Sequence, residues 1–232
     1  IKDYFLILFI DSDIKPSKNL VNEHVNFHSL NKNIHAVGGE ISPSFKIKFK
    51  NIWHMLDGCM SWFTSVGTKK YNLIKFPYHL PTSNLSIKCD FLRKKKIFFN
   101  EKLETGEDVD FCNQLRKKGG TIALINNAKV VHFDRSNFIS FFKHQIKWGF
   151  HQYYTLYSSN FRNSLVTKLY SFLFLLLYPL LMPFINFISS ILVIFPWVKK
   201  NPFYIVLFPL IFITYIFKGV ATYIEFLRNN FD

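Results

Sequence analysis

Asp11 and Asp13 follow directly after an apolar run at residues 4–10. Side chains two positions apart point to the same side of an extended chain, and open α/β sheets bind ligands at the carboxyl ends of their strands. Carboxylate oxygens placed there suit Mg²⁺ or Mn²⁺, which usually also contact substrate phosphates. The alternative is that both aspartates only begin a turn or cap the helix expected after Pro16, and this pattern alone leaves both interpretations open.

A second acidic cluster spans residues 104–110 and contains the pair Glu107-Asp108. Thr105 and Asp108 have the spacing of a capping box, and acidic residues in a first turn also suit the helix dipole. A carboxylate held at the start of a helix can nevertheless act as a general base, so the two roles are compatible. The spacing of Val109, Cys112 and Leu115 predicts a buried helix face, with Asp108 directed to the opposite side.

Three histidines have patterns that could bind metal. His132 ends a strand-like run, where a lone histidine is usually structural. It becomes a candidate metal ligand if the fold brings it close to Asp13. His24 and His28 have metal-ligand spacing on a helix, but a solvated helix face is the favoured interpretation of this pair.

An alternation of strands and helices must position these residues. The continuous apolar run at 4–10 is typical of a parallel strand covered on both faces, and Asn126-Asn127 predicts a turn between two strands. The mixture indicates an α/β domain. The expected strands are 4–10, 34–41, 84–87, 121–125 and 129–133; the expected helices are 16–30, 105–118 and 136–157; and 51–66 is aromatic-rich and ambiguous.

The composition changes near residue 168. Residues 169–195 carry no charge, and a helix of this length would span a membrane, with a kink at Pro179 and Pro183. A pair of shallow half-helices is the alternative. Residues 201–217 form a second apolar run at the short end of the spanning range, for which a buried core helix is a serious alternative. We therefore expect a catalytic domain at 1–165 and a membrane anchor at 166–232.

The net charge of +14 raises the question of nucleic acid. The lysines are scattered and accompany no recognisable nucleic-acid motif, so we expect no nucleic-acid partner. Such a charge also suits anionic lipid headgroups. The cysteines at 59, 89 and 112 are far apart, which favours free thiols in a reducing compartment.

The order of these motifs resembles the family-2 glycosyltransferases of the GT-A fold. The resemblance covers about residues 4–150, and its strength lies in the ordered set rather than in any one element. The matching residues are Ile10-Asp11-Ser12-Asp13 with Pro16, Val37-Gly38-Gly39, Thr82-Ser83-Asn84-Leu85-Ser86-Ile87, Phe99-Asn100-Glu101, Gly106-Glu107-Asp108-Val109-Asp110-Phe111, Leu115-Arg116 with Gly119, and Ala128-Lys129-Val130-Val131-His132.

The resemblance implies a role for each candidate residue. Asp11 and Asp13 would bind the donor diphosphate through a divalent cation, Mg²⁺ or Mn²⁺, with His132 as a third metal ligand and Asn84 as a further donor-binding residue. Asp108 of the Glu107-Asp108 pair would deprotonate the acceptor hydroxyl, which then attacks the anomeric carbon with inversion.

The chain also departs from the family pattern in two places. The family's opening strand and its Gly/Pro/Asn-rich nucleotide-binding elements would precede Ile1, so we expect a partial GT-A (Rossmann-like) domain that lacks its first nucleotide-binding strands. Processive relatives carry Gln-x-x-Arg-Trp near the membrane; Lys147-Trp148 is similar to its end, but His144 stands in place of Gln. This favours a non-processive enzyme.

The sequence therefore predicts an α/β nucleotide-sugar transferase domain on the cytoplasmic face of the cell membrane, followed by membrane-associated helices. It would transfer sugar from a nucleotide-sugar donor to a lipid-linked or surface-glycan acceptor. The acceptor class is inferred from the membrane tether, because an enzyme held at the membrane meets such acceptors there. The alternative is a non-catalytic membrane scaffold or an inactive glycosyltransferase fragment.

Overall fold

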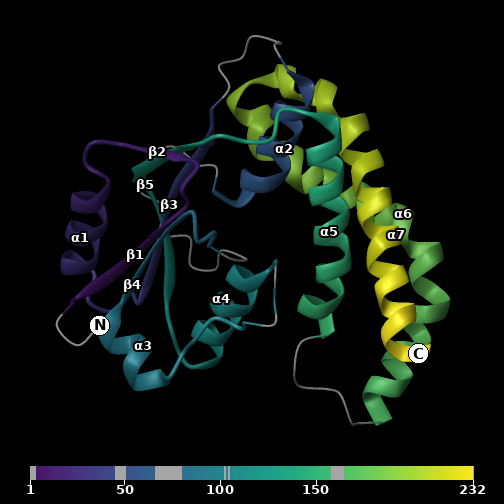
Figure 1. Cartoon of the computed structure of the whole chain (residues 1–232), viewed down its shortest axis with the longest axis horizontal. Coiled ribbons are helices and arrows are strands. Elements are labelled where there is room, and N and C mark those ends of the chain that lie inside the picture. Colours follow the sequence, from purple (N-terminus) through teal and green to yellow (C-terminus); the bar gives the residue numbers. More distant parts are fainter. Residues whose placement is uncertain are drawn as a thin grey trace. The chain divides into compact units, whose positions relative to one another are not determined.

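The structure is a computed structural model that describes residues 4–44, 51–65, 80–101, 103, 105–157 and 165–231, with the backbone alone at 154–157, 165–172 and 230–231. The chain divides into two compact units (Figure 1). One contains a β-sheet with helices α1–α4 and ends at Asp134; the other is helical and contains α5, α6 and α7. The division falls ahead of the change in composition near residue 168, because α5 belongs to the helical unit.

The first unit is built on a mixed five-stranded sheet with the order β1-β4-β3-β5-β2. β3 and β5 are parallel, and the other pairs of neighbouring strands are antiparallel. Helices on the sheet confirm the predicted α/β class. The strands are β1 (Leu6–Ile10), β2 (Ile14–Pro16), β3 (Ala36–Pro43), β4 (Asn84–Lys88) and β5 (Ile122–His132).

Two strand predictions need correction. β1 is not a parallel strand buried on both faces: it pairs antiparallel with β4 and is an edge strand within the described residues, with half-exposed side chains. β5 is one strand, not two strands joined by a turn at Asn126-Asn127. Its pairing with β3 shifts between Gly39 and Glu40, which oppose Ile125 and Lys129. The polar residues that resemble a turn are therefore accommodated in a bulge.

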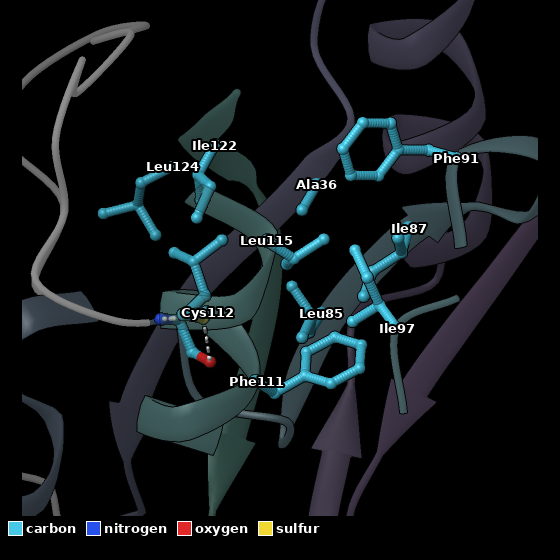
Figure 2. Close-up of a cluster of buried hydrophobic side chains, with 11 residues drawn as sticks. Ala36, Leu85, Ile87, Phe91, Ile97, Phe111, Cys112, Leu115, Ile122 and Leu124 are labelled. Atoms are coloured by element: carbon cyan, nitrogen blue, oxygen red, sulfur yellow. Dashed lines mark hydrogen bonds between the residues drawn. The ribbon is translucent and has the colours of Figure 1, made fainter. Parts of the chain in front are cut away.

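The alternation of side chains along β4 gives the sheet two different faces. Leu85 and Ile87 point into an apolar core with helices α3 (Cys89–Lys95) and α4 (Glu107–Lys117) (Figure 2). Asn84 and Ser86 point to the opposite face. The core cluster consists of Ala36, Leu80, Leu85, Ile87, Phe91, Ile97, Phe111, Cys112, Leu115, Ile122 and Leu124.

Helix α1 (Leu20–Leu30) lies over the polar face of the sheet through two buried histidines. Asn84 Oδ1 is only an acceptor, so His24 Nε2 donates to it at 2.9 Å. His24 Nδ1 then accepts from Ser86 Oγ at 2.8 Å, and Ser86 Oγ accepts from His28 Nε2 at 2.9 Å. The expected solvated helix face is wrong: both histidines are 1% exposed and join α1 to β4.

Acid should weaken the fold through these histidines. Burial lowers the pKa of His24, and burial followed by the charge of Lys88 lowers the pKa of His28 to about 4. Unfolded histidine takes up a proton near pH 6.5 and folded His28 only near pH 4, so stability present above pH 6.5 is lost as pH falls between these values. We expect His28 alone to contribute on the order of 3 kcal/mol to this loss.

The variant His28→Gln tests this expectation, because glutamine keeps a donor for Ser86 and does not titrate. Thermal melting of the full chain in detergent, followed as a function of pH, should show a shallower acid destabilisation for His28→Gln than for the natural chain. Equal slopes in the two proteins would mean that His28 has the same pKa in the folded and unfolded states.

The remaining helices of the first unit differ from expectation mainly in extent. The ambiguous segment at 51–66 contains α2 (Ile52–Trp62), which is followed by a 3₁₀ turn, η1 (Phe63–Ser65). Asn51 caps the start of α2, because its Oδ1 accepts a hydrogen bond from Trp53 N at 3.0 Å. Helix α3 is not apparent from the sequence. The basic run 93–96 forms the last turn of α3 and its left-handed cap at Lys96, where φ is 48°. Gly119 ends α4 at φ 81°, as its position predicts.

The helical unit consists of α5 (Phe138–Tyr157), α6 (Leu165–Lys200), the 3₁₀ segment η2 (Pro202–Leu207) and α7 (Phe208–Phe231). Prolines interrupt α6 at three internal positions, including the predicted Pro179. A proline removes the N–H that would bond the carbonyl four residues earlier. For Pro179 that carbonyl belongs to Leu175, and the Tyr223 hydroxyl of α7 donates to it at 3.0 Å. The helix therefore continues through the proline.

Two helical stretches, Leu173–Lys200 and Pro202–Asn229, are long and apolar enough to cross a membrane. In the most apolar 18-residue part of each stretch, 22% and 28% of the residues, respectively, are buried. A core helix of a soluble protein would bury much more of such a surface, so the buried-helix alternative for residues 201–217 loses support. Both stretches are candidate membrane spans.

Candidate metal and catalytic site

Strand pairing brings Asp13 and His132 together although they are far apart in the sequence. β2 begins directly after Asp13 and pairs with the end of β5, so that Ile14 opposes His132. Phe133 N donates to Asp13 O at 3.0 Å and extends this pairing by one residue. The turn between β1 and β2 therefore lies against the carboxyl end of β5, the edge where open α/β sheets bind ligands.

Asp11, Asp13 and His132 form a cluster with the chemistry of a divalent-metal site. One potential ligand atom from each residue lies within 4.8 Å of the other two. His132 Nε2 is 3.3 Å from Asp13 Oδ1 and 3.9 Å from Asp11 Oδ2. The side chains of Asp11 and Asp13 are 41% and 56% exposed, which leaves their outer side open to a ligand. Two carboxylates and one imidazole fit Mg²⁺ or Mn²⁺, with other positions left for water or phosphate.

Asp134 fixes the orientation of the His132 ring through a hydrogen bond on the side away from the two aspartates. Its carboxylate is fully buried and accepts from His132 Nδ1 at 3.1 Å and from Trp62 Nε1. Donation from Nδ1 leaves the lone pair on Nε2 directed at the two aspartates, the arrangement found behind many metal-binding histidines. Burial by itself lowers the pKa of His132, but the hydrogen bond and charge of Asp134, with the charges of Asp13 and Asp11, outweigh it and raise the pKa.

Ser83 and Asn84 connect this cluster to the sheet. Ser83 Oγ donates to Asp11 Oδ2 and so fixes the first aspartate. Asn84, expected to contact the donor, is 0% exposed, and Asn84 Nδ2 donates to Ala128 O at 3.0 Å and to Glu40 O at 3.3 Å. Its hydrogen-bonding groups are thus engaged inside the fold. Asn84 therefore supports the site from within the sheet, and its contact with the donor stays a prediction.

Gly39 is required by the position of Asn84. A Cβ atom at Gly39 would lie 2.2 Å from both Asn84 Nδ2 and Ala128 O. No other residue fits without displacing the asparagine or the backbone of β5. The Gly38-Gly39 pair, which resembles a break in the strand, is therefore a place where a side chain crosses beneath the backbone.

Asp108 lies in the first turn of α4 and is half-buried. Its Oδ1 accepts from Val109 N at 2.7 Å. Desolvation is the main cause that raises the pKa of Asp108 to about 6, and the charge of Asp11 adds to it against the backbone hydrogen bonds. The charge of Asp11 therefore acts on Asp108, which places Asp108 within electrostatic reach of the Asp11–Asp13–His132 cluster.

The expected capping box is not present among the described residues. α4 begins at Glu107, and the Thr105 hydroxyl is buried and has no hydrogen-bond partner in the part of the chain that the structure describes. Glu107 is half-buried at the start of the helix, next to Asp108. The predicted buried face of α4 is formed by Cys112 and Leu115 together with Phe111, while Val109 is only half-buried.

Ser83, Trp62 and Asp134 were not assigned to the site from the sequence. Trp62 is 8% exposed, its ring centre lies 4.5 Å from that of His132, and its Nε1 donates to Asp134. The only sequence signal for Asp134 is its position two residues after His132. Ser83 gives no signal by type alone, since its role depends on the pairing of β4 with β1.

The family model of glycosyl transferase family group 2 matches residues 6–218. No curated protein matches the chain. The match extends from β1 into α7 and includes the aspartates, Asp108 and His132. The chain therefore belongs to glycosyl transferase family group 2 and is a glycosyltransferase, an enzyme that transfers sugar from a nucleotide-sugar donor to an acceptor.

Proposed function

We propose that the chain carries out an inverting, non-processive and metal-dependent transfer of one sugar to an acceptor hydroxyl. The observation that carries this proposal is the convergence of ligand atoms from Asp11, Asp13 and His132 within 4.8 Å, with the raised-pKa carboxyl of Asp108 in electrostatic reach. A cation-binding group and a tuned base at one end of a sheet are the two parts that such a reaction needs.

Asp11, Asp13 and His132 would hold Mg²⁺ or Mn²⁺ and, through it, the donor diphosphate. When bound, the cation offsets the negative charge that develops on the departing nucleoside diphosphate. Ser83 keeps Asp11 in place, and Asp134 keeps Nε2 of His132 directed at the aspartates.

Asp108 is the proposed general base. Its carboxylate takes the proton of the acceptor hydroxyl, and the oxygen attacks the anomeric carbon from the side opposite the leaving diphosphate. The new glycosidic bond forms as the bond to the diphosphate breaks, and the configuration inverts. Glu107 precedes Asp108 at the open start of the helix, where it would help to place the acceptor or the base.

The acceptor is proposed to be a lipid-linked or surface glycan met at the cytoplasmic side of the cell membrane. The support is the pair of candidate spans, Leu173–Lys200 and Pro202–Asn229, in the same chain as the transferase sheet. The non-processive assignment rests on the stretch His144–Trp148, which lacks the Gln-x-x-Arg-Trp pattern of processive relatives.

Transfer assays on the full chain in lipid nanodiscs would test this function. UDP-glucose, UDP-N-acetylglucosamine, UDP-galactose and GDP-mannose would each be supplied with Mn²⁺ or with EDTA, and with extracted membrane glycolipids as acceptor. We expect one donor to label the lipid fraction with a single sugar of inverted anomeric configuration, and only with the cation. Retained configuration, polymeric product or full activity in EDTA would each contradict one part of the proposal.

The pH dependence of transfer should report the base. With a pKa of about 6, Asp108 is ionised above that pH and protonated below it. The rate at saturating donor and Mn²⁺ should therefore fall as pH drops through about 6, with a single proton taken up. An acidic limb near pH 4, the ordinary range of an aspartate, would contradict the assignment of a desolvated base.

A further inference from the structure

Helices α5, α6 and α7 line a half-open cavity of about 390 Å³ in the helical unit. Most of its lining is apolar, and several lining side chains of α6, including Leu173, Leu177 and Leu181, are 42–48% exposed. The cavity therefore borders the apolar surface of a candidate membrane span. Its polar lining includes Asn186 from α6 and Lys218 from α7.

Lys218 brings a positive charge to this cavity, and its Nζ has no carboxylate partner in the part of the chain that the structure describes. Its Nζ lies 4.9 Å from the ring centre of Trp148 and 5.5 Å from that of Tyr215. Between residues 135 and 231 the sequence has one acidic side chain, Glu225, and this residue pairs with Arg228 at 3.8 Å. Aromatic faces stabilise a cation only in part. A lysine in the middle of an apolar helix is costly and usually marks a functional site.

Asn186 supplies a second polar group at the same place. Its side chain is 5% exposed, and its Nδ2 has no hydrogen-bond partner among the described residues. A buried amide that lacks a partner is unfavourable by about 1–3 kcal/mol, so a ligand acceptor atom would stabilise it.

Two glycines allow the three helices to approach closely here. A Cβ atom at Gly219 would lie 2.9 Å from Asn186 Nδ2, and one at Gly149 would lie 2.5 Å from Lys218 O. Small residues at helix contacts permit such packing in membranes. Lys218 and Asn186 are therefore held at one junction by the packing of α5 and α6 against α7.

We propose that this cavity binds the phosphate headgroup of an anionic lipid, with Lys218 pairing the phosphate and Asn186 donating to one of its oxygens. A lipid is favoured over a soluble anion because the leucine side chains that line the cavity are also exposed on the apolar surface. Acyl chains could lie along them while the headgroup meets the lysine. This site goes beyond sugar transfer and needs neither donor nor divalent cation.

Native mass spectrometry of the full chain in detergent would test the site, without donor or metal, so that the result is independent of the transferase proposal. The probes are dioleoyl phosphatidic acid, dioleoylglycerol, which has the same chains without phosphate, and glycerol 3-phosphate, which has the phosphate without chains. The variants are Lys218→Met and Asn186→Leu. Lys200→Met is the matched control, because Lys200 also lies over a tryptophan ring, that of Trp197, at 5.8 Å.

We expect phosphatidic acid to bind at one tight site, with affinity reduced about tenfold or more in Lys218→Met and several-fold in Asn186→Leu, and unchanged in Lys200→Met. If dioleoylglycerol binds as tightly as phosphatidic acid, the cavity is purely apolar. If glycerol 3-phosphate binds as tightly, the site takes soluble anions. If Lys218→Met binds phosphatidic acid as tightly as the unmodified chain, the lipid binds elsewhere. Each of these results overturns the proposal. If Lys218→Met does not fold, unchanged affinity in Asn186→Leu overturns it instead.

Discussion

Replacing Asp108 with asparagine should reduce sugar transfer by about 10²–10⁴-fold, the usual effect of removing a positioned general base. The amide keeps an oxygen that can accept from Val109 N, as the carboxylate does at 2.7 Å, so the start of α4 should be preserved. It cannot take the proton of the acceptor hydroxyl. Single-turnover transfer with bound donor and Mn²⁺ would measure the chemical step, and donor affinity should stay close to its natural value.

Thermal stability of Asp108→Asn distinguishes a loss of catalysis from a loss of folding. The pKa of Asp108 is raised from 3.8 to about 6 in the folded chain, so unfolding releases a proton between these values and the fold is destabilised as pH rises through them. The asparagine removes that penalty, and Asp108→Asn should melt no lower than the natural chain at neutral pH. Asp90→Asn is the control, because Asp90 is an exposed acid that pairs locally with Arg93. Near-normal transfer by a folded Asp108→Asn protein would rule out the base.

Replacing Asp13 with asparagine should instead weaken donor binding that depends on Mn²⁺. The change removes one charged oxygen from the cluster in which His132 Nε2 lies 3.3 Å from Asp13 Oδ1. Even residues behind a metal ligand change metal affinity by 10–100-fold, so loss of a ligand should reduce donor affinity by about 100-fold or more. Calorimetric titration of the donor, with and without Mn²⁺, would measure the effect.

The two conditions of that titration make the result specific. Without Mn²⁺ the natural chain and Asp13→Asn should bind the donor equally weakly, and the difference should appear only when the cation is added. An equal loss of affinity in both conditions would mean that Asp13 shapes the loop rather than holds a cation. The Asp13 side chain is 56% exposed, and asparagine keeps an oxygen that can face the buried Nε2 of His132, so the substitution should preserve the fold.

Much of the site could be predicted from the sequence because its residues occur in local patterns. Asp11 and Asp13 follow a strand, Asp108 begins a helix, and His132 ends a strand, as expected. The ordered family resemblance was needed to connect them, since no spacing relates Asp13 to His132. The pairing of β2 with β5 makes that connection, and β2 is a three-residue strand with no hydrophobic pattern of its own.

One group of errors has a common physical cause, which is that buried polar residues resemble surface residues or ligands in the sequence. His24, His28 and Asn84 are polar, yet they are buried together because their hydrogen bonds satisfy one another. Single-residue patterns do not show which partner a buried polar group will find. The same reason explains why Asp134 was missed: its buried charge is stabilised by Trp62, which is 72 positions earlier in the sequence.

Binding of Mn²⁺ itself tests the central claim most directly. Electron paramagnetic resonance of free Mn²⁺, titrated with the full chain in the presence of UDP or GDP, would count the bound ions. We predict one bound Mn²⁺ per chain, lost or strongly weakened in Asp13→Asn and retained in Asp108→Asn. Mn²⁺ binding that is unchanged in Asp13→Asn, or absent from the natural chain with either nucleotide, would contradict a metal centre at Asp11, Asp13 and His132.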